Sequence, residues 1–209
     1  YIVGEETLVK NIKSLSPGSY IKSFNLNPKK LYINQFFDIT KVEPVKSNKN
    51  ELQEKLLFSL KKSVHEQFQA DAKVGFQVSG GVDSTIVASI ASELNIRPHD
   101  TYFVSMKNSV HDEIEYAKCV AEKFKFSFNV VGLTEKKYFQ SIQQVASFHD
   151  TPINHPHSVA IYLLSKLASS KVKVLISGEG ADELCFGYLR YKKDQLFSDN
   201  DILNNYSFL

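Results

Sequence analysis

The chain has 209 residues, of which 43% are hydrophobic and 23% are charged, and its formal net charge at pH 7 is only +2. This composition is ordinary for a globular protein and gives no reason to expect a nucleic-acid partner. No apolar run approaches the roughly 20 residues that cross a bilayer, and the first residues, YIVGEETLVK, lack the features of a secretory signal. We therefore expect a cytoplasmic protein without membrane or nucleic-acid partners.

Residues 1–44 differ in pattern from the rest of the chain. Two short β-like runs, LSPGSYIKSF and NPKKLYINQFFDI, flank the turn signal Asn27-Pro28. They predict a β-hairpin and a linker that do not make a complete domain. The main domain is expected over residues 45–209. Because the chain starts without methionine and stops without an obvious structural end, we expect it to be cut from a longer protein.

From Asn50 onward, helical and strand patterns alternate. Apolar residues recur every four positions from Leu52 to Phe68, which predicts an amphipathic helix. The strands that follow are nearly continuous apolar runs, which is typical of strands buried on both faces, and the helices between them favour right-handed crossovers. The sequence therefore predicts an α/β fold with a doubly wound, mostly parallel sheet. The expected strands are residues 74–78, 102–106, 126–131 and 172–176, and the expected helices are residues 84–94, 112–124, 135–148 and 156–168.

The motif SGGVDST, residues 79–85, follows the first of these strands. Ligands of open α/β sheets bind at the carboxyl ends of strands, and the amides at the start of the next helix attract anions. Gly80 and Gly81 allow a ligand close to the backbone, while Ser79 and Ser84 supply hydroxyl groups. The common patterns G-x-x-x-x-G-K-[ST] and G-x-G-x-x-G are absent, which argues against γ-phosphoryl and hydride transfer.

Asp83 lies where a carboxylate would repel a phosphate. A magnesium ion between them resolves this conflict, because Mg²⁺ prefers one or two carboxylates together with phosphate oxygens and water. Alternatively, Asp83 is a helix-start carboxylate that the helix dipole favours, and Gly80-Gly81 is an ordinary turn between a strand and a helix.

A second motif, VLISGEGADELCFGYLRY, again lies at the carboxyl end of a strand, the fourth of those expected. Glu179, Asp182 and Glu183 lie close together there, and carboxylates at this spacing repel one another unless a cation neutralises them. We therefore expect Asp182 to be a second magnesium ligand, opposite Asp83. A surface loop that leads into an acidic helix start remains the alternative.

The first motif resembles the signature of the PP-loop ATP pyrophosphatases, and the two motifs together resemble the synthetase domain of glutamine-dependent asparagine synthetases. Residues 177–183 and Gly187-Tyr188 match the second signature of that family closely. ETLVKNIKSLSPGSYI is similar to the closing strands of the family's glutaminase domain. LQEKLLFSLKKSVHEQF is similar to the helix before its ATP loop.

This resemblance implies a ligase that uses ATP and Mg²⁺. It would adenylate a carboxylate, most simply the aspartate side chain, and release pyrophosphate, and ammonia would then displace AMP to give asparagine. The resemblance implies that Ser79, Gly80, Gly81, Asp83 and Ser84 bind pyrophosphate and metal. The strand end at Val104-Ser105 would contact the adenine through its backbone, Asp112 would lie near the nucleotide, and Ser177 and Gly178 would contact the ribose and α-phosphate. Glu179 would serve adenylation or amidation, and Asp182 would hold the metal and take part in catalysis.

Two departures from the family pattern limit this chain. Neither Cys119 nor Cys185 occupies the place of the family's N-terminal glutaminase nucleophile, so we expect ammonia to come from a glutaminase domain outside the chain. The sequence also stops soon after GYLRYKKDQLF, where the family continues. We therefore expect a C-terminally truncated synthetase domain, which can be inactive alone. A homodimer is one possible state of the full-length protein. We interpret Lys192 and Lys193 as surface charges, and contacts with phosphate are the second interpretation.

The sequence does not decide which carboxylate is the acceptor of the amide nitrogen. Asp150 and His155, in the loop HDTPINHPHS, could line the acceptor pocket, and a sugar acid, a peptide or another carboxylate is an alternative to aspartate. His155 and His157 are two residues apart and no H-E-x-x-H spacing occurs, which argues against a histidine metal site. A nucleotide-binding domain without catalysis is the alternative from another class, although Asp83, Glu179 and Asp182 argue against it.

Overall fold

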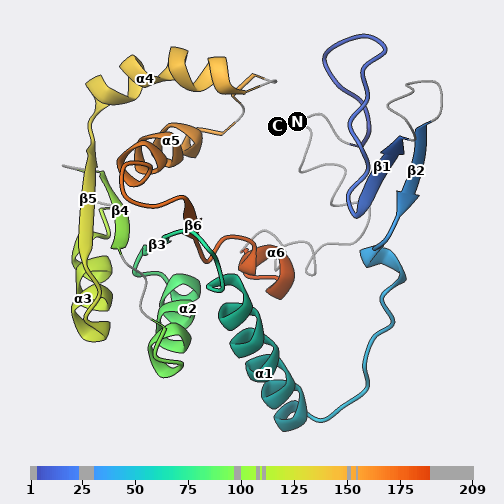
Figure 1. Ribbon diagram of the computed structural model, residues 1–209, viewed down its shortest axis with the longest axis horizontal. Coiled ribbons are helices and arrows are strands. Elements are labelled where there is room, and N and C mark those ends of the chain that lie inside the picture. Colours follow the sequence, from blue (N-terminus) through green and yellow to red (C-terminus); the bar gives the residue numbers. More distant parts are fainter. Residues whose placement is uncertain are drawn as a thin grey trace, which may run out of the picture.

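A computed structural model of the chain describes residues 4–23, 31–96, 100–106, 109, 112–149, 152–153 and 155–188 (Figure 1). Among these residues, no helix is both long enough and apolar enough to cross a membrane. The elements are β1 (Ser19–Ser23), β2 (Leu31–Gln35), the 3-10 helix η1 (Ile39–Lys41), α1 (Lys49–Gln67), β3 (Val74–Gln77), α2 (Val82–Glu93), β4 (Asp100–Met106), α3 (Ile114–Phe124), β5 (Phe128–Leu133), α4 (Glu135–Phe148), α5 (His157–Ala168), β6 (Val174–Ile176) and α6 (Ala181–Cys185).

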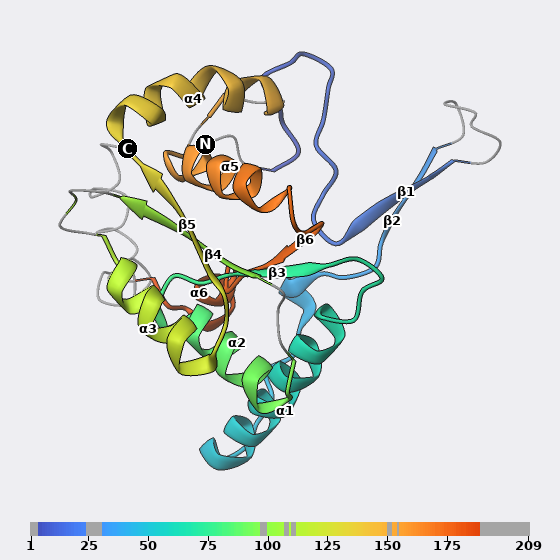
Figure 2. The same cartoon turned by 60° about the vertical axis from the view of Figure 1, so that its left-hand side comes forward.

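Four of the strands form a parallel sheet in the order β5-β4-β3-β6. Figure 2 shows α4 and α5 on one side of this sheet and α1, α2 and α3 on the other. The predicted α/β fold with a doubly wound parallel sheet is therefore confirmed.

The alternation of side chains along β4 builds a core on each face of the sheet. Phe103 packs with Phe76 and with Ala117 of α3 on one face. Tyr102, which is fully buried, packs with Leu164 of α5 on the other face. Consecutive side chains of a strand point to opposite faces, and both faces are covered by helices, so the strand is apolar almost without interruption.

Several expected boundaries were wrong in detail. The third strand of the sheet spans residues 128–133 and not 126–131, because Phe126 still closes the end of α3 by donating its N–H to the carbonyl of Ala121 at 2.9 Å. The fourth begins at residue 174 because Val172 donates to the carbonyl of Ala168 at 2.9 Å. The helix expected over residues 112–124 begins two residues later than expected, at Ile114. The helix expected from residue 84 and the strand expected from residue 102 each begin two residues earlier, at Val82 and Asp100.

Only the C-terminal part of the predicted apolar stripe, three of its five residues, is packed. Leu60, Val64 and Phe68 contact α2 through Ile90 and Ala91. In contrast, Leu52 and Leu56 are 42% and 52% exposed. The periodicity therefore identified the helix correctly, but it did not reveal where the neighbouring helix ends.

The predicted hairpin at the N-terminus is confirmed. β1 and β2 pair antiparallel, with Ser19 opposite Gln35 and Ser23 opposite Leu31. Every residue of β2 is exposed. The division of the chain at residue 44 stays a prediction.

The strand order places the two sequence motifs side by side. β3 and β6 are neighbours, with Phe76 paired to Ile176, although 100 residues separate the two positions in sequence. β4 and β5 lie on the other side of β3, so the chain reverses its direction of winding between β3 and β6. In open α/β sheets this reversal marks the crevice where ligands bind.

A polar network lies at the amino end of β4, on the opposite side of the sheet from the carboxyl ends where the two motifs lie. Oδ1 of Asp100 accepts hydrogen bonds from Ser127 Oγ at 3.1 Å, Asn129 Nδ2 at 3.0 Å and Lys171 Nζ at 3.3 Å. Lys171 also donates to Asn129 Oδ1 at 3.0 Å. Burial acts to raise the pKa of the Asp100 carboxyl, but these hydrogen bonds outweigh it and hold the pKa below its ordinary value.

This lowered pKa predicts loss of stability in acid. Because the carboxyl of Asp100 binds its proton less readily in the folded chain than in the unfolded chain, its stabilisation is present above about pH 4 and is lost as the pH falls through the folded-state value. We expect the free energy of unfolding to fall below about pH 4 in the parent chain. Asp100→Asn should lower it by about 1–3 kcal/mol at pH 7 and flatten this dependence. Urea unfolding at pH 3 and pH 7 measures both effects, and Asp71→Asn, at an exposed position, is the control.

Candidate active site

The loop of residues 79–81, here called the SGG loop, needs glycine at its centre. Gly80 has a φ of +79°, and a Cβ atom there would lie 2.5 Å from Cβ of Tyr116 on α3. The loop therefore lies directly against α3. The next residue, Gly81, is the N-cap of α2 and makes no side-chain capping hydrogen bond. Because glycine has no side chain, the N-cap residue does not occupy the backbone N–H groups at the start of α2. These N–H groups lie at the carboxyl end of β3.

Hydroxyl groups brace the SGG loop from within. Ser79 Oγ accepts from the Gly81 N–H at 3.2 Å and lies 2.8 Å from Ser84 Oγ. Ser84 Oγ also accepts from the Ser79 N–H and donates to the Gly81 carbonyl, both at 3.2 Å. Ser84 is only 5% exposed. Its hydroxyl therefore holds the shape of the loop, in addition to any contact with a ligand.

The second motif packs against the first through a glycine. A Cβ atom at Gly178 would lie 2.8 Å from the backbone N of Ser84 and 3.0 Å from the carbonyl carbon of Asp83. Only a residue without a side chain allows this approach of two backbones. The turn continues with the N–H of Glu179 donating to Ser177 Oγ at 3.3 Å, and Gly180 has a φ of +92°.

The absence of a side chain at Gly187 leaves space for the carboxylate of Asp182. A Cβ atom at Gly187 would lie 1.9 Å from Oδ1 of Asp182, and the Gly187 N–H donates to the Asp182 carbonyl at 3.0 Å. Tyr188 follows, and its hydroxyl donates to Glu183 Oε1 at 2.6 Å. The Gly-Tyr pair at the end of the motif therefore sets the positions of two acidic side chains.

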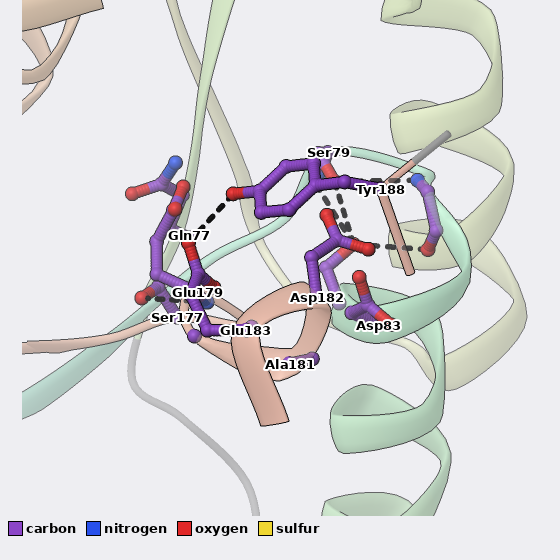
Figure 3. Close-up of a pocket in the computed structure, with 13 residues that line it drawn as sticks. Gln77, Ser79, Asp83, Ser177, Glu179, Ala181, Asp182, Glu183 and Tyr188 are labelled. Atoms are coloured by element: carbon purple, nitrogen blue, oxygen red, sulfur yellow. Dashed lines mark hydrogen bonds between the residues drawn. The ribbon is translucent and has the colours of Figure 1, made fainter. Parts of the chain in front are cut away.

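Both motifs line one pocket of ≈ 130 Å³, here called the motif pocket. Figure 3 shows the carboxylates of Asp83 and Asp182 turned toward the same part of it, beside Ser79, while Glu179 lies near Gln77. Its lining residues are Gln77, Ser79, Gly81, Asp83, Ser84, Ser177, Gly178, Glu179, Gly180, Ala181, Asp182, Glu183 and Tyr188.

The donor set of the motif pocket fits magnesium. Two half-buried carboxylates, Asp83 and Asp182, lie beside a loop suited to phosphate. Across the described ranges, no cluster of three or more His, Cys, Asp or Glu side chains could hold a metal by itself. Mg²⁺ needs no such cluster, since one or two carboxylates with phosphate oxygens and water complete its coordination.

A larger pocket of ≈ 480 Å³ adjoins the motif pocket and is called here the side pocket. The two share Gln77, Ser79, Glu179 and Tyr188, so Glu179 lies where they meet. The other residues that line the side pocket are Val78, Phe103, Val104, Met106, Asp112, Glu113, His155, His157, Ala160, Ile161 and Leu164.

Ser105 and Asp112 act together at the edge of the side pocket. The Ser105 side chain is 2% exposed and its hydroxyl donates to Asp112 Oδ2 at 2.6 Å, while the Ile114 N–H donates to Oδ1 at 3.3 Å. Asp112 lines the pocket and Ser105 does not. The structure thus gives the Ser105 side chain a positioning role toward Asp112, distinct from the adenine contact that the sequence suggested for this strand end.

Ser105→Ala tests this role. Loss of the buried hydroxyl removes a hydrogen bond to a carboxylate that is worth about 1.5–3 kcal/mol, so Asp112 should lose its fixed direction. We expect the KM for the nucleotide to rise about tenfold, with a smaller change in kcat. The matched control is Ser141→Ala, which removes a buried hydroxyl on α4, outside both pockets. An unchanged KM in Ser105→Ala would contradict the positioning role.

The structure brings most of the sequence-predicted residues together. Eight of them line the motif pocket, Asp112 lines the side pocket, and Gly80 and Ser105 support these walls without lining them. Asp150, Lys192 and Lys193 lie outside the described residues. Sequence reasoning missed Gln77, and it named Tyr188 as part of the family signature without giving it a place in the site. A polar residue at the end of an apolar strand was the available signal for Gln77.

The family model described as Asparagine synthase matches residues 55–204, which include both motifs and every strand of the parallel sheet. The chain belongs to the asparagine synthase family. The expected family, inferred from the two motifs, is therefore confirmed. The match extends beyond the motifs to the helices that support them.

Relatives within the asparagine synthase family are similar over most of this chain. Asparagine synthetase [glutamine-hydrolyzing] 1 of Bacillus subtilis is 26% identical over 92% of the chain and 30% of its own length. Putative asparagine synthetase [glutamine-hydrolyzing] 1 of Methanocaldococcus jannaschii is 30% identical over 90% of the chain and 35% of its own length. The chain thus spans about a third of the length of these relatives.

Among solved structures, the NH3-dependent NAD synthetase of Campylobacter jejuni has a TM-score of 0.43 and 15% identity, covering 68% of this chain and 62% of that one. The NMN synthetase of Francisella tularensis has a TM-score of 0.45 and 20% identity, covering 69% of this chain and 60% of that one. The assignment to the asparagine synthase family rests on the family model and not on these weaker likenesses.

Proposed function

We propose that the protein carrying this chain makes an amide from a carboxylate and ammonia, at the cost of cleaving ATP to AMP and pyrophosphate. The observation that carries this proposal is the contact of Gly178 with the first turn of α2, because it brings the three carboxylates of the second motif to the same pocket as Asp83 and an anion-binding loop. Residues 45–209 would be the ATP-binding synthetase domain, and residues 1–44 the end of a glutaminase-like domain.

In this proposal the SGG loop binds the β- and γ-phosphates. The amides at the start of α2 and the hydroxyls of Ser79 and Ser84 are the donors available there. Ser177 and Gly178 face them from the second motif and would hold the α-phosphate side. Asp83 and Asp182 would hold Mg²⁺, which when bound neutralises charge on the departing pyrophosphate.

The chemistry takes two displacements. A carboxylate oxygen attacks the α-phosphorus, the bond from the α-phosphorus to the bridging oxygen breaks, and pyrophosphate leaves. Ammonia then attacks the acyl carbon, and AMP leaves with the bonding electrons of the acyl–oxygen bond. Glu179, which lies where the two pockets meet, is placed to accept the proton that the attacking nitrogen must lose.

The nitrogen source and the acceptor are parts of the same proposal. Ammonia would come from glutamine hydrolysis in a domain outside this chain, and aspartate is the acceptor we propose. Positioning supplies much of the rate in such a reaction, because the carboxylate and the α-phosphorus must meet in line.

Pyrophosphate release tests the function. With the full-length protein, ATP, Mg²⁺ and ammonium chloride, we expect pyrophosphate and AMP to form in equal amounts with aspartate. Glutamate, a uronic acid and a peptide carboxylate complete the panel, and a response to one of these alone would replace aspartate as the acceptor. ATP binding by calorimetry without pyrophosphate release for any acid would refute amide synthesis and favour a non-catalytic nucleotide-binding role.

A further inference from the structure

Gln77 is a polar residue at the end of a strand that is otherwise apolar and buried. It is the last residue of β3 and is half-buried, whereas Val74, Gly75 and Phe76 are buried. A Cβ atom at Gly75 would lie 2.8 Å from Cε2 of Tyr102, so Gly75 faces the side of the sheet that α5 covers. Alternate residues of a strand share a face, and the side chain of Gln77 therefore points to the same side, toward the side pocket.

The side-chain amide of Gln77 is an uncommitted hydrogen-bond donor where the two pockets meet. The residues shared by both pockets are Gln77, Ser79, Glu179 and Tyr188. Because Ser84 Oγ donates to a backbone carbonyl, the hydroxyl proton of Ser79 is directed to Ser84 Oγ. The hydroxyl of Tyr188 donates to Glu183, and an ionised Glu179 can only accept. The Gln77 side chain makes no hydrogen bond in the described part of the chain, so its two N–H groups are open to a ligand.

The charges around the junction make this donor distinctive. Six carboxylates line the two pockets, and no lysine or arginine is among the described residues of their walls. Magnesium fits beside Asp83 and Asp182, next to the loop suited to phosphate. The imidazoles of His155 and His157 line the side pocket but not the motif pocket. Among the shared residues, Gln77 is therefore the one whose side chain is suited to a negative charge that develops at the junction.

The second displacement of the proposed reaction creates such a charge. When ammonia attacks the acyl carbon of the adenylated acid, the new C–N bond forms and the π electrons of the carbonyl move onto the acyl oxygen. They return when the bond to the AMP oxygen breaks. A fixed N–H donor at the acyl oxygen stabilises this charge, and removal of one such donor lowers the rate by roughly 10²–10³-fold. Glu179, which lies near Gln77 (Figure 3), would meanwhile take the proton of the attacking nitrogen.

We propose that Gln77 is a catalytic residue of this second displacement and that its side-chain N–H donates to the acyl oxygen as ammonia attacks. The inference rests on the proposed function and divides its two steps between different groups. The SGG loop and the magnesium ligands serve adenylation, where charge moves onto phosphate oxygens. Gln77 and Glu179 serve amide formation. A polar side chain at a strand position that packing alone would make apolar is consistent with such a role, because departures from the local pattern gather at functional sites.

Rapid-quench turnover of Gln77→Leu and Gln77→Met in the full-length protein separates the two steps. Labelled ATP is mixed with excess enzyme, Mg²⁺, ammonium chloride and aspartate, or the acid that supports pyrophosphate release. The initial loss of ATP reports adenylation, and the appearance of amide and AMP reports the second step. We expect ATP loss within about twofold of the parent rate, amide formation slower by roughly 10²-fold, and accumulation of the adenylate. Leucine and methionine are close to glutamine in volume and break no hydrogen bond in the described chain, so we expect both variants to fold.

The matched control is Gln143→Leu, the same change at an exposed position of α4 that lines neither pocket. Both of its rates should equal those of the parent. If ATP loss in the Gln77 variants slowed as much as amide formation, the proposal would be overturned, since Gln77 would then serve the nucleotide or the first step. Unchanged amide formation would overturn it as well. A parent protein that consumed no ATP with any acid would instead refute the proposed function itself.

Discussion

Replacing Asp83 or Asp182 by asparagine is expected to lower kcat by roughly 10²–10³-fold, which is the usual cost of removing one group that stabilises transition-state charge. Both carboxylates are half-buried and turn toward the same part of the motif pocket. Asparagine keeps the size of the side chain but removes the charge that Mg²⁺ needs. The remaining activity should require a higher magnesium concentration. Initial rates of pyrophosphate release over a magnesium titration measure both effects.

The control for Asp83→Asn must separate a metal ligand from a helix-start carboxylate. Asp83 lies in the first turn of α2, and Glu115 lies in the first turn of α3, so Glu115→Gln removes the same favourable charge from a helix start. Both changes should cost about 0.3–1 kcal/mol of stability through the helix dipole. Only Asp83→Asn should lower kcat and raise the magnesium concentration that turnover requires. Equal turnover in the two variants would show that Asp83 has the structural role alone.

Gly178→Ala is expected to weaken ATP binding by about 10–100-fold, because a misplacement of about 1 Å in such a site has effects of this size. The added methyl group would lie 2.8 Å from Ser84 N and 3.0 Å from the carbonyl carbon of Asp83. Backbone cannot rotate away as a flexible side chain can, so the second motif must move off the SGG loop. Calorimetric titration with a non-hydrolysable ATP analogue measures the change in affinity.

Gly180→Ala is the matched control, two residues away in the same turn. A Cβ atom at Gly180 would have no heavy atom within 4 Å among the described residues, although its φ of +92° makes any side chain strained. This variant should therefore lose about 1–2 kcal/mol of stability without a clash against α2. If Gly178→Ala bound ATP as well as Gly180→Ala after correction for stability, the close packing of the two motifs would have no part in nucleotide binding.

The fold was largely predictable because its signals are local. Nearly continuous apolar strands separated by helices predicted the parallel α/β sheet, and two β-like runs around the sequence signal Asn27-Pro28 predicted the hairpin of β1 and β2. The errors lie where tertiary contacts decide. Phe126 is of a type common in strands, but its N–H completes the turn after α3. Leu56 belongs to the predicted apolar stripe of α1, but its side chain is exposed.

The candidate site was predictable to the extent that its residues lie in two short motifs. Contacts between side chains of different segments could not be predicted, because no periodicity in the sequence reveals them. The hydrogen bond from Ser105 to Asp112 and the contact between the rings of His155 and His157 both depend on side-chain directions in connections between elements. The need for Gly187 also becomes visible only when Asp182 is placed beside it.

The hydrogen bonds inside the SGG loop and its contact with Gly178 have a consequence for affinity. Ser79, Gly81 and Ser84 hold one another by hydrogen bonds within the loop, and the second motif packs against them through its backbone. A nucleotide would therefore meet a preorganised cradle, and the conformational entropy of ordering it would be lost during folding rather than at each turnover. Substitutions that loosen this cradle should consequently appear first as weaker ligand binding, before any change in melting temperature.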